Sequence, residues 1–375
     1  MPRLLKLALT QFRNYERLTW QPDNALLVLT GTNGSGKTNL LEAISLLSPG
    51  RGLRAAPLAQ LGRNGSEAWG VSASFEIDGS PVEIGTGAQA GADGSRRSFL
   101  FNGRQNRSAA GWEEAPSAVW ITPQMDRLFS EGASGRRRFL DRLVIAVTPQ
   151  HARELAAYDR AMSQRNRLLQ TRFSEQSWLG ALEATMAQHA VAVAAARNDV
   201  VHLLSHYAST ALGAFPAIQL RMDCPISDRL LQHPALAVED WLRTRLESLR
   251  DQDRTRGRTT SGVHRSDFVL SDHQSGQQAA LASTGQQKAL LLGVILAHAR
   301  LVEDRRNAAP LLLLDEPLVH LDAGRRATLL ESVRSFRTTV ILTGTDVEPF
   351  AELKSHARFS VLQQGAFLPS LTKTR

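Results

Sequence analysis

An eight-residue loop at residues 31–38 constrains this chain more than any other stretch of its 375 residues. It reads Gly31-Thr32-Asn33-Gly34-Ser35-Gly36-Lys37-Thr38 and matches the pattern G-x-x-x-x-G-K-[ST] in full. Glycines let such a loop wrap around phosphates with its backbone N–H groups pointing inward. We therefore expect all eight residues to contact ATP, with Lys37 at the β- and γ-phosphates and the Thr38 hydroxyl on Mg²⁺.

The residues on either side separate this loop from an ordinary glycine-rich turn. An apolar run at residues 25–29 precedes the loop and predicts a buried strand. After the loop, apolar side chains at positions 40, 41, 44 and 47 follow a helical spacing. A turn that binds no ligand is the alternative, and the succession of strand, loop and helix disfavours it.

A second constraint is the segment Leu311-Leu312-Leu313-Leu314-Asp315-Glu316. Four leucines predict a strand buried on both faces, with two carboxylates at its C-terminal end, where α/β sheets bind ligands. We expect Asp315 to bind Mg²⁺ and Glu316 to orient or deprotonate an attacking water, so that these two and Lys37 form the catalytic set. Two carboxylates that only cap a strand are the alternative, but an ATPase needs both this segment and the phosphate loop.

A third segment, Ala282-Ser283-Thr284-Gly285-Gln286-Gln287-Lys288, leads into an apolar helix predicted at residues 286–301. A serine hydroxyl, bare glycine backbone and a helix start together favour an anion, so Ser283, Gly285 and Gln286 are expected to contact the nucleotide. Alone the pattern is weak, because Ser-Thr-Gly at a helix start is common as a simple N-cap. Its position, about 30 residues before the acidic strand end, makes it informative.

The chain is expected to fold as an α/β protein whose two ends build one domain around an inserted helical domain. Residues 1–130 and 251–375 are the predicted ATPase domain, and residues 131–250 are the predicted insertion. The insertion is rich in Ala, Leu, Arg and Gln, and Pro149 is its only proline between residues 135 and 211. Such a composition predicts long helices.

Periodicity places further elements along the chain. Short alternating segments over residues 66–101 predict antiparallel hairpins. Helices are predicted at residues 136–147, 150–173, 178–212, 238–250 and 322–336, and strands at residues 4–9, 18–20, 264–270, 310–314 and 339–343. Residues 250–260 are charged, contain glycine and have few apolar side chains, so we expect an exposed loop there.

Charge and cysteine content indicate which partners and which cellular compartment suit the chain. Lys and Arg number 44 against 36 for Asp and Glu, giving a net charge of +8. This balance favours anionic partners such as nucleic acid, although solubility alone explains it equally well.

The single cysteine, Cys224, excludes an intramolecular disulfide and a Cys-rich zinc site. The first residues lack a signal-peptide pattern, and no apolar run reaches the ~18–20 residues of a membrane span, so we expect a cytoplasmic location.

The three segments, in this order, resemble the ABC-type ATPases. In that family a signature loop, here residues 283–286, covers the γ-phosphate held by the phosphate loop of a second subunit. Leu321-Asp322 resembles the D-loop that crosses the same interface. Gln124, in Ile121-Thr122-Pro123-Gln124, is the expected counterpart of the Q-loop glutamine and a further Mg²⁺ ligand, with a surface glutamine as the alternative.

Three more segments narrow the resemblance: Phe12-Arg13-Asn14-Tyr15, Arg136-Arg137-Arg138-Phe139-Leu140-Asp141 and Gly262-Val263-His264-Arg265-Ser266-Asp267. They are similar to motifs of the RecF family of bacterial DNA replication and repair proteins, and the similarity runs from the N-terminus to about residue 346. Members of that family are related to the SMC ATPases but lack their long coiled coil. Lys37 and Asp315 are accordingly too close in the chain for a long coil to separate them.

The resemblance implies an ATP-dependent DNA-binding protein with weak ATPase activity, in which ATP and Mg²⁺ close a homodimer on DNA. It further implies RecR and RecO as partners, loading of RecA at single-stranded gaps, and a role in SOS induction. Two departures stand out. Asp315-Glu316 replaces the two aspartates common in relatives, and residues 341–346 lack a switch histidine, for which Thr345 or Asp346 is the expected substitute. A nucleotide-binding subunit of a membrane transporter and a P-loop phosphotransferase are the competing classes.

Two basic clusters are candidates for contact with DNA phosphates: Arg136, Arg137 and Arg138, and Arg250, Arg254, Arg256 and Arg258. A solvated surface is an equal alternative for each cluster. No helix-turn-helix, zinc-finger or RNA-recognition pattern is present, so we expect recognition of DNA structure and not of base sequence. His264 has no His or Cys at metal-ligand spacing, so a structural or interface role is expected for it.

Overall fold

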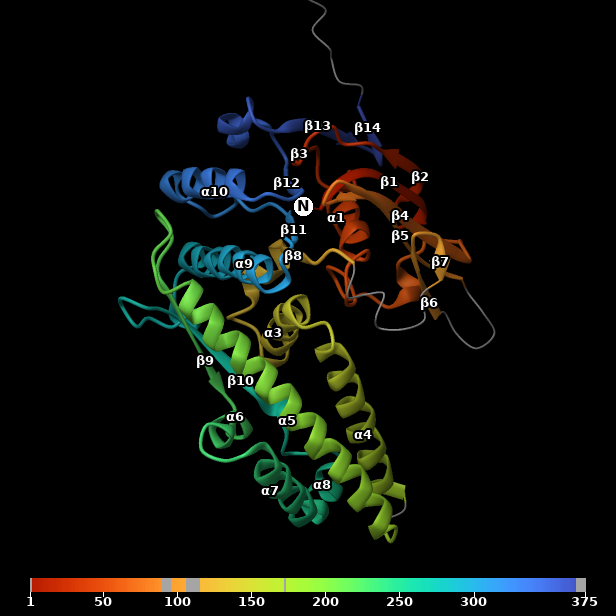
Figure 1. Ribbon diagram of the computed structural model, residues 1–375, viewed down its shortest axis with the longest axis vertical. Helices are drawn as coiled ribbons and strands as arrows, with labels where there is room; N and C mark the ends of the chain where they lie inside the picture. The colour runs from red at the N-terminus through yellow and green to blue at the C-terminus, as the bar shows by residue number, and fades with distance from the viewer. Residues whose placement is uncertain (1, 90–95, 106–114, 172, 369–375) are drawn as a thin grey trace, which may run out of the picture. The chain divides into compact units, whose positions relative to one another are not determined.

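The computed structural model describes residues 2–89, 96–105, 115–171 and 173–368. It divides the chain into two compact units, whose elements are labelled in Figure 1. Unit 1 comprises Met1–Asp126, Ala211–Pro216 and Ser283–Arg375, and unit 2 comprises Arg127–Thr210 and Ala217–Ala282. The expected α/β class is confirmed, because strands from both ends of the chain share one sheet in unit 1.

The sheet that carries the phosphate loop has the strand order β14-β13-β3-β12-β11-β8. Strands β13, β3, β12, β11 and β8 are parallel, and β14 pairs antiparallel with β13. Their bounds are β3 Leu26–Thr30, β8 Ala118–Ile121, β11 Leu311–Leu314, β12 Val340–Gly344, β13 Arg358–Gln363 and β14 Ala366–Phe367. Because parallel strands end at one edge, the residues that follow β3, β11 and β12 meet there.

A second, antiparallel sheet in unit 1 has the strand order β2-β1-β4-β5-β6-β7. One hydrophobic core joins residues of this sheet and of the parallel sheet to α1 (Lys37–Ser45), whose Leu40, Leu41 and Ile44 are buried in it. The hairpins predicted for residues 66–101 are confirmed as β4, β5 and β6. The strand bounds are β1 Arg3–Phe12, β2 Tyr15–Trp20, β4 Ala68–Ile77, β5 Ser80–Gln89, β6 Arg96–Phe101 and β7 Arg104–Gln105.

Two C-terminal helices, α9 (Thr284–Arg306) and α10 (Ala323–Ser335), also belong to unit 1. Helix α9 is buried along most of its length and contacts β8. The short segment at residues 211–216 returns to this unit, where the Ala214 N–H donates to Thr328 Oγ1 of α10 at 3.1 Å. Across the described residues of both units, none of the helices is long and apolar enough to cross a membrane.

Unit 2 is mainly helical and is organised around the 32-residue helix α5, which contacts α4, α7 and the strand β9. Its helices are α3 Ala133–Val147, α4 His151–Thr171, α5 Gln176–Tyr207, α6 Pro225–Leu230, α7 Ala235–Ser248 and α8 Arg250–Arg256. Strand β9 (Ile218–Asp223) pairs antiparallel with β10 (Asp267–Asp272). Unit 2 extends to Ala282, so residues 251–282, which the sequence placed in the ATPase domain, belong to it.

The structure differs from the sequence-based elements at three places in unit 2. Residues 250–260 were expected to form a loop, but residues 250–256 form α8, because Arg250 and Asp253 are buried and bind partners on α4 and α5. The strand expected at residues 264–270 begins only at Asp267, after a 3-10 turn at Val263–Arg265. The proline-containing passage after α5, to which no element was assigned, forms β9 and α6.

Candidate nucleotide-binding site

The phosphate loop follows β3 directly and encloses the side chain of Lys37. The Lys37 ammonium group donates to the carbonyl oxygens of Gly31 at 2.6 Å and Thr32 at 3.1 Å, and the residue is buried. Burial lowers the pKa of Lys37, while the nearby charges of Glu316 and Asp315 act in the opposite direction. The cation of the loop and the carboxylates of the acidic segment therefore share one electrostatic environment.

Glycine is required at the two ends of the loop and leaves space in its middle. Gly31 has φ +149° and Gly36 has φ +110°, where other residues are strained. A Cβ at Gly31 would lie 2.2 Å from the carbonyl oxygen of Leu362, and one at Gly36 would lie 2.6 Å from the Tyr15 hydroxyl. At Gly34, by contrast, no atom of the described residues would lie within 4 Å of an added Cβ.

Asp315, which directly follows β11, connects the end of the phosphate loop to the neighbouring strand β12. Its Oδ2 accepts from the Thr38 hydroxyl at 2.7 Å, and its Oδ1 accepts from the Thr343 hydroxyl at 2.7 Å. Asp315 is only 1% exposed, so both oxygens of a buried carboxylate are hydrogen-bonded. The structure thus brings together Lys37, Thr38 and Asp315, which the sequence predicted as neighbours, and adds Thr343 at the end of β12.

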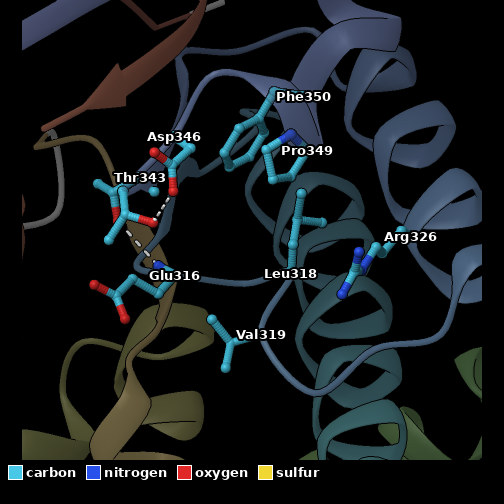
Figure 2. Close-up of a pocket in the computed structure, with 10 residues that line it drawn as sticks. Glu316, Leu318, Val319, Arg326, Thr343, Asp346, Pro349 and Phe350 are labelled. Atoms are coloured by element: carbon cyan, nitrogen blue, oxygen red, sulfur yellow. Dashed lines mark hydrogen bonds between the residues drawn. The ribbon is translucent and has the colours of Figure 1, made fainter.

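Glu316 lies beside this cluster and is one of the residues that line a small pocket of about 130 Å³ (Figure 2). Its φ is +48°, and its backbone N–H donates to Thr343 Oγ1 at 2.9 Å. Thr345 and Asp346, the expected substitutes for the switch histidine, line the same pocket, and their side chains are hydrogen-bonded to each other at 2.7 Å. Thr343 therefore fixes Asp315 through its donated hydrogen bond and the Glu316 backbone through its accepted one.

The segment Phe12-Arg13-Asn14-Tyr15 packs against the loop and the helix behind it. The Tyr15 hydroxyl donates to the Gly36 carbonyl at 2.9 Å, and burial raises the pKa of Tyr15. Arg13 makes two hydrogen bonds of 2.8 Å to the carboxylate of Glu42 on α1. Sequence reasoning recognised this segment as a family motif but did not identify its contacts, since they join residues 21 and 29 positions apart.

Glu42 is buried and lies between two arginines. Arg54 donates to Glu42 Oε2 at 2.8 Å and also to Asn39 Oδ1 at 2.7 Å. Asn39 in turn donates to Asn14 Oδ1 at 2.7 Å. This network fixes the first turns of α1, and with them the orientation of the loop that precedes the helix.

The expected signature loop is well ordered by its own hydrogen bonds at the start of α9. The Ser283 hydroxyl accepts from the Gln286 N–H at 3.4 Å, and the Gln286 side chain accepts from the Ser283 N–H at 3.0 Å, which is a capping box. Ser283 and Gln286 are exposed. A Cβ at Gly285 would lie 3.1 Å from the carbonyl oxygen of His320, beside the expected D-loop, where Asp322 caps α10.

Gln124 lies in a 3-10 turn, Pro123–Arg127, that follows β8 at the same edge of the parallel sheet. Its side chain is exposed, and no contact that the structure shows joins it to Asp315 or Thr38. Two residues later, Asp126 accepts from the buried ammonium group of Lys288 on α9 at 2.7 Å. The turn that holds Gln124 is therefore connected to the signature helix.

The other two family motifs lie in unit 2 and contact each other there. Arg136 forms an ion pair with Asp267 at 2.7 Å, and Arg137 donates to the Ser266 carbonyl at 2.8 Å. His264 lies 2.6 Å from the Tyr158 hydroxyl and 3.0 Å from the Thr259 carbonyl oxygen. These bonds give Arg136 and Arg137 structural partners inside unit 2, whereas Arg138 is exposed.

The phosphate loop has the features that a magnesium–triphosphate group needs. Ser35 Oγ is buried and has no hydrogen-bond partner among the residues that the structure describes. A buried hydroxyl without a partner is costly, so a ligand oxygen at this position would stabilise it. The space at Gly34, the Lys37 ammonium group and the oxygens of Thr38 and Asp315 complete a set of groups suited to phosphate and Mg²⁺.

Comparison with known proteins agrees with this geometry. Residues 26–343 match the family described as "AAA domain, putative AbiEii toxin, Type IV TA system". Two curated relatives, from Mesorhizobium japonicum and Rhizobium etli, are 42% and 41% identical over 97% and 96% of this chain, and in each case over 97% of the relative. Both are named DNA replication and repair protein RecF.

Solved structures show the same fold. A RecF structure, described as a recombination mediator protein with ATPrS in the RecFOR pathway, aligns with a TM-score of 0.84 at 23% identity, covering 98% of this chain and 97% of its own. The Smc head domain from Pyrococcus furiosus aligns with a TM-score of 0.53 at 16% identity, covering 98% of this chain and 95% of its own. On its sequence identity to the curated relatives over nearly the whole length, the chain belongs to the RecF family of DNA replication and repair proteins.

Proposed function

We propose that this protein binds ATP and Mg²⁺ at residues 31–38 and uses ATP hydrolysis to control its binding to DNA. The observation that carries the proposal is the hydrogen-bonded set of Thr38, Asp315 and Thr343. Thr38 lies in the first turn of α1, Asp315 follows β11, and Thr343 lies near the end of β12. Thr38 and Asp315 are 277 positions apart in the chain, and the three side chains meet beside the Lys37 ammonium group. Such a convergence of a phosphate loop with a buried carboxylate is what phosphoryl transfer requires.

Each residue has a distinct task in this proposal. Lys37 binds the β- and γ-phosphate oxygens, and Thr38, Asp315 and Gln124 would hold Mg²⁺, which supplies positive charge that neutralises the phosphate oxygens. Thr343 orients the Asp315 carboxylate through its 2.7 Å hydrogen bond. Glu316 orients the attacking water or takes its proton.

ATP also joins two copies of the chain in the proposed cycle. Ser283, Gly285 and Gln286 of one copy would cover the triphosphate held by residues 31–38 of the other. The exposed side chains of Ser283 and Gln286 at the start of α9 support this role, because a helix N-terminus is a favourable site for an anion. The capping box orders this loop without a ligand, so little ordering entropy is lost when it binds one.

The names of the relatives support a role in DNA repair, and the RecFOR pathway of the solved RecF structures supports RecR and RecO as partners. We extend the proposal to loading of RecA at single-stranded gaps, to SOS induction, to a weak ATPase activity coupled to reopening of the dimer, and to a cytoplasmic location.

Binding to duplex, single-stranded and gapped DNA, measured across a salt series with and without ATP and Mg²⁺, tests the proposal. We expect binding that needs ATP and weakens steeply with salt, because the contacts are to phosphates. For the variant Asp315→Asn, DNA binding is expected to be the same with and without ATP and Mg²⁺. DNA binding that is equal with and without ATP in the unaltered protein would contradict the coupling.

A further inference from the structure

One face of α4 carries arginines at a spacing of seven residues. Arg153, Arg160 and Arg167 are all exposed, whereas Tyr158, Arg165 and Leu169 of the same helix are buried. Seven residues advance a helix by about 10 Å and return to within about 20° of the same direction. The three arginines therefore follow one side of α4, roughly opposite its buried side chains. We call them the α4 arginine stripe.

The arginines of the stripe differ from the buried arginines of unit 2 in their partners. Arg165 and Arg197 are buried and form ion pairs with carboxylates of the same unit at 2.7–2.9 Å. Among the described residues, none of the three stripe arginines forms an ion pair with a carboxylate. The acidic residues of α4 lie off the stripe, and one of them, Glu154, is bonded to His189 at 2.6 Å.

The positive charge continues beyond the C-terminal end of α4. The Gln170 side chain donates to the Arg254 carbonyl of α8 at 2.6 Å, which places the two helices in contact. Arg254, Arg256 and Arg258 are exposed, and the Arg254 guanidinium lies 4.6 Å from the centre of the Phe173 ring. Arg250, the fourth member of this expected cluster, is instead buried and paired with Glu183 at 2.5 Å.

We propose that the α4 arginine stripe, continued by Arg254, Arg256 and Arg258, binds the phosphate backbone of double-stranded DNA. This inference rests on the proposed DNA-binding function and assigns the surface that carries it. Positions about 10 Å apart on a rigid helix lie between the widths of the minor and major grooves of B-DNA, about 6 and 12 Å, so long arginine side chains can reach phosphates on both sides of a groove. Arginine is suited to these contacts because its guanidinium forms paired hydrogen bonds with phosphate oxygens.

The residues between the arginines favour a duplex over a single strand. Ala156, Gln164 and Thr171 lie along the same face, and none of them has an aromatic ring on which a base could stack. Sites for single strands combine positive charge with such rings. Phe173, an aromatic residue just after α4, lies against the Arg254 guanidinium.

The test replaces the three stripe arginines together, as Arg153→Gln, Arg160→Gln and Arg167→Gln, and measures binding to a blunt 30-base-pair duplex with ATP and Mg²⁺. Each lost phosphate contact lowers the slope of log K against log salt by about 0.9, so the slope is expected to fall by about 2.7. A fourfold rise in salt should then weaken the unaltered protein about 40-fold more than the variant. ATP turnover and ATP-dependent dimerisation are expected to be unchanged.

The control is a second triple variant with the same charge change, Arg221→Gln, Arg243→Gln and Arg334→Gln, whose arginines are exposed elsewhere. Its salt slope is expected to equal that of the unaltered protein. An equal loss of slope in both variants would show a general charge effect and overturn the assignment. A stripe variant that keeps the slope would overturn it while leaving the proposed function intact, and loss of single-strand binding alone would overturn the choice of duplex. Absence of DNA binding by the unaltered protein would overturn both.

Discussion

Single hydroxyl groups determine the geometry of the candidate site. Thr343 donates to Asp315 and accepts from the Glu316 N–H, so one side chain positions both carboxylate-bearing residues. Tyr15 has a comparable role at the Gly36 carbonyl. The sequence revealed Lys37, Thr38 and Asp315 because each belongs to a local pattern with a known chemistry. Tyr15 lies in a recognised family motif and Thr343 in the segment expected to replace the switch histidine, but their roles were not predicted, because their partners are distant in the chain.

Thr343→Val is expected to reduce both stability and turnover. Valine has the shape of threonine but leaves a buried carboxylate oxygen and the Glu316 N–H without their partner, which costs about 1–3 kcal/mol. We expect the free energy of unfolding to fall by that amount and kcat of ATP hydrolysis to fall more than nucleotide affinity. Urea unfolding and steady-state kinetics measure these effects. Thr343→Ser keeps the hydroxyl and serves as the control, and an equal loss in both variants would mean that packing, not hydrogen bonding, is responsible.

At the scale of elements, buried ion pairs account for α8, the helix of unit 2 that the sequence predicted as a loop. The expected loop at residues 250–260 contains a helix because Arg250 pairs with Glu183 of α5, and Asp253 pairs with Arg165 of α4. A charged, glycine-containing segment favours a loop when it is considered alone. The partners that reverse this preference lie 67 and 88 positions away, so local composition does not contain them. Long periodic helices such as α4 and α5 were predicted because their signal is local.

Arg165→Met is expected to destabilise unit 2 by about 3–5 kcal/mol. The substitution leaves Glu183 and Asp253 buried with an unmatched charge, and breaking a buried ion pair in this way is more costly than losing a surface pair. Arg167→Met, two residues away on the exposed side of α4, is the matched control and should change the free energy of unfolding by less than about 0.5 kcal/mol. Equal effects in chemical denaturation would contradict the role assigned to the buried pair.

His264 makes the stability of unit 2 depend on pH. Burial lowers its pKa below the ordinary value, and its Nε2 must carry a proton because the Thr259 carbonyl only accepts. The unfolded state therefore binds a proton more readily than the folded state. The neutral His264 ring therefore contributes fully to the free energy of unfolding above about pH 6.5. This contribution is lost as the pH falls through the lower pKa of His264 in the folded state. Urea unfolding at pH 7.5 and 5.5 should show a smaller difference in His264→Gln than in the unaltered protein.

For the whole molecule, the proposed site is divided between copies of the chain. In each proposed site, residues 31–38 come from one copy of the chain, and the exposed start of α9 comes from the other copy. The capping box already orders Ser283 and Gln286 in the single chain. Dimerisation is thus expected to follow ATP binding.

Ser283→Arg is expected to abolish ATP-dependent dimerisation and to leave ATP binding by the single chain within about twofold. The long cationic side chain would occupy the place of the triphosphate, while residues 31–38 stay unchanged. Sedimentation with and without ATP measures the first effect, and nucleotide titration measures the second. Ser283→Ala removes the helix cap, at a cost of about 1 kcal/mol, without adding bulk. A Ser283→Arg protein that dimerises normally would contradict the divided site.

The position of β3 between β12 and β13 sets the order in which the protein can be completed during synthesis. Val340 follows Thr30 by about 310 residues, so β3 has neither neighbour in the parallel sheet until nearly the whole chain has been made. At about 5–20 residues per second, this delay is roughly 15–60 s. Unit 2 ends at Ala282, so all of its residues have been made before β12 and β13. A chain that stops before residue 340 would therefore lack both neighbours of β3 and the Thr343 hydroxyl that donates to Asp315.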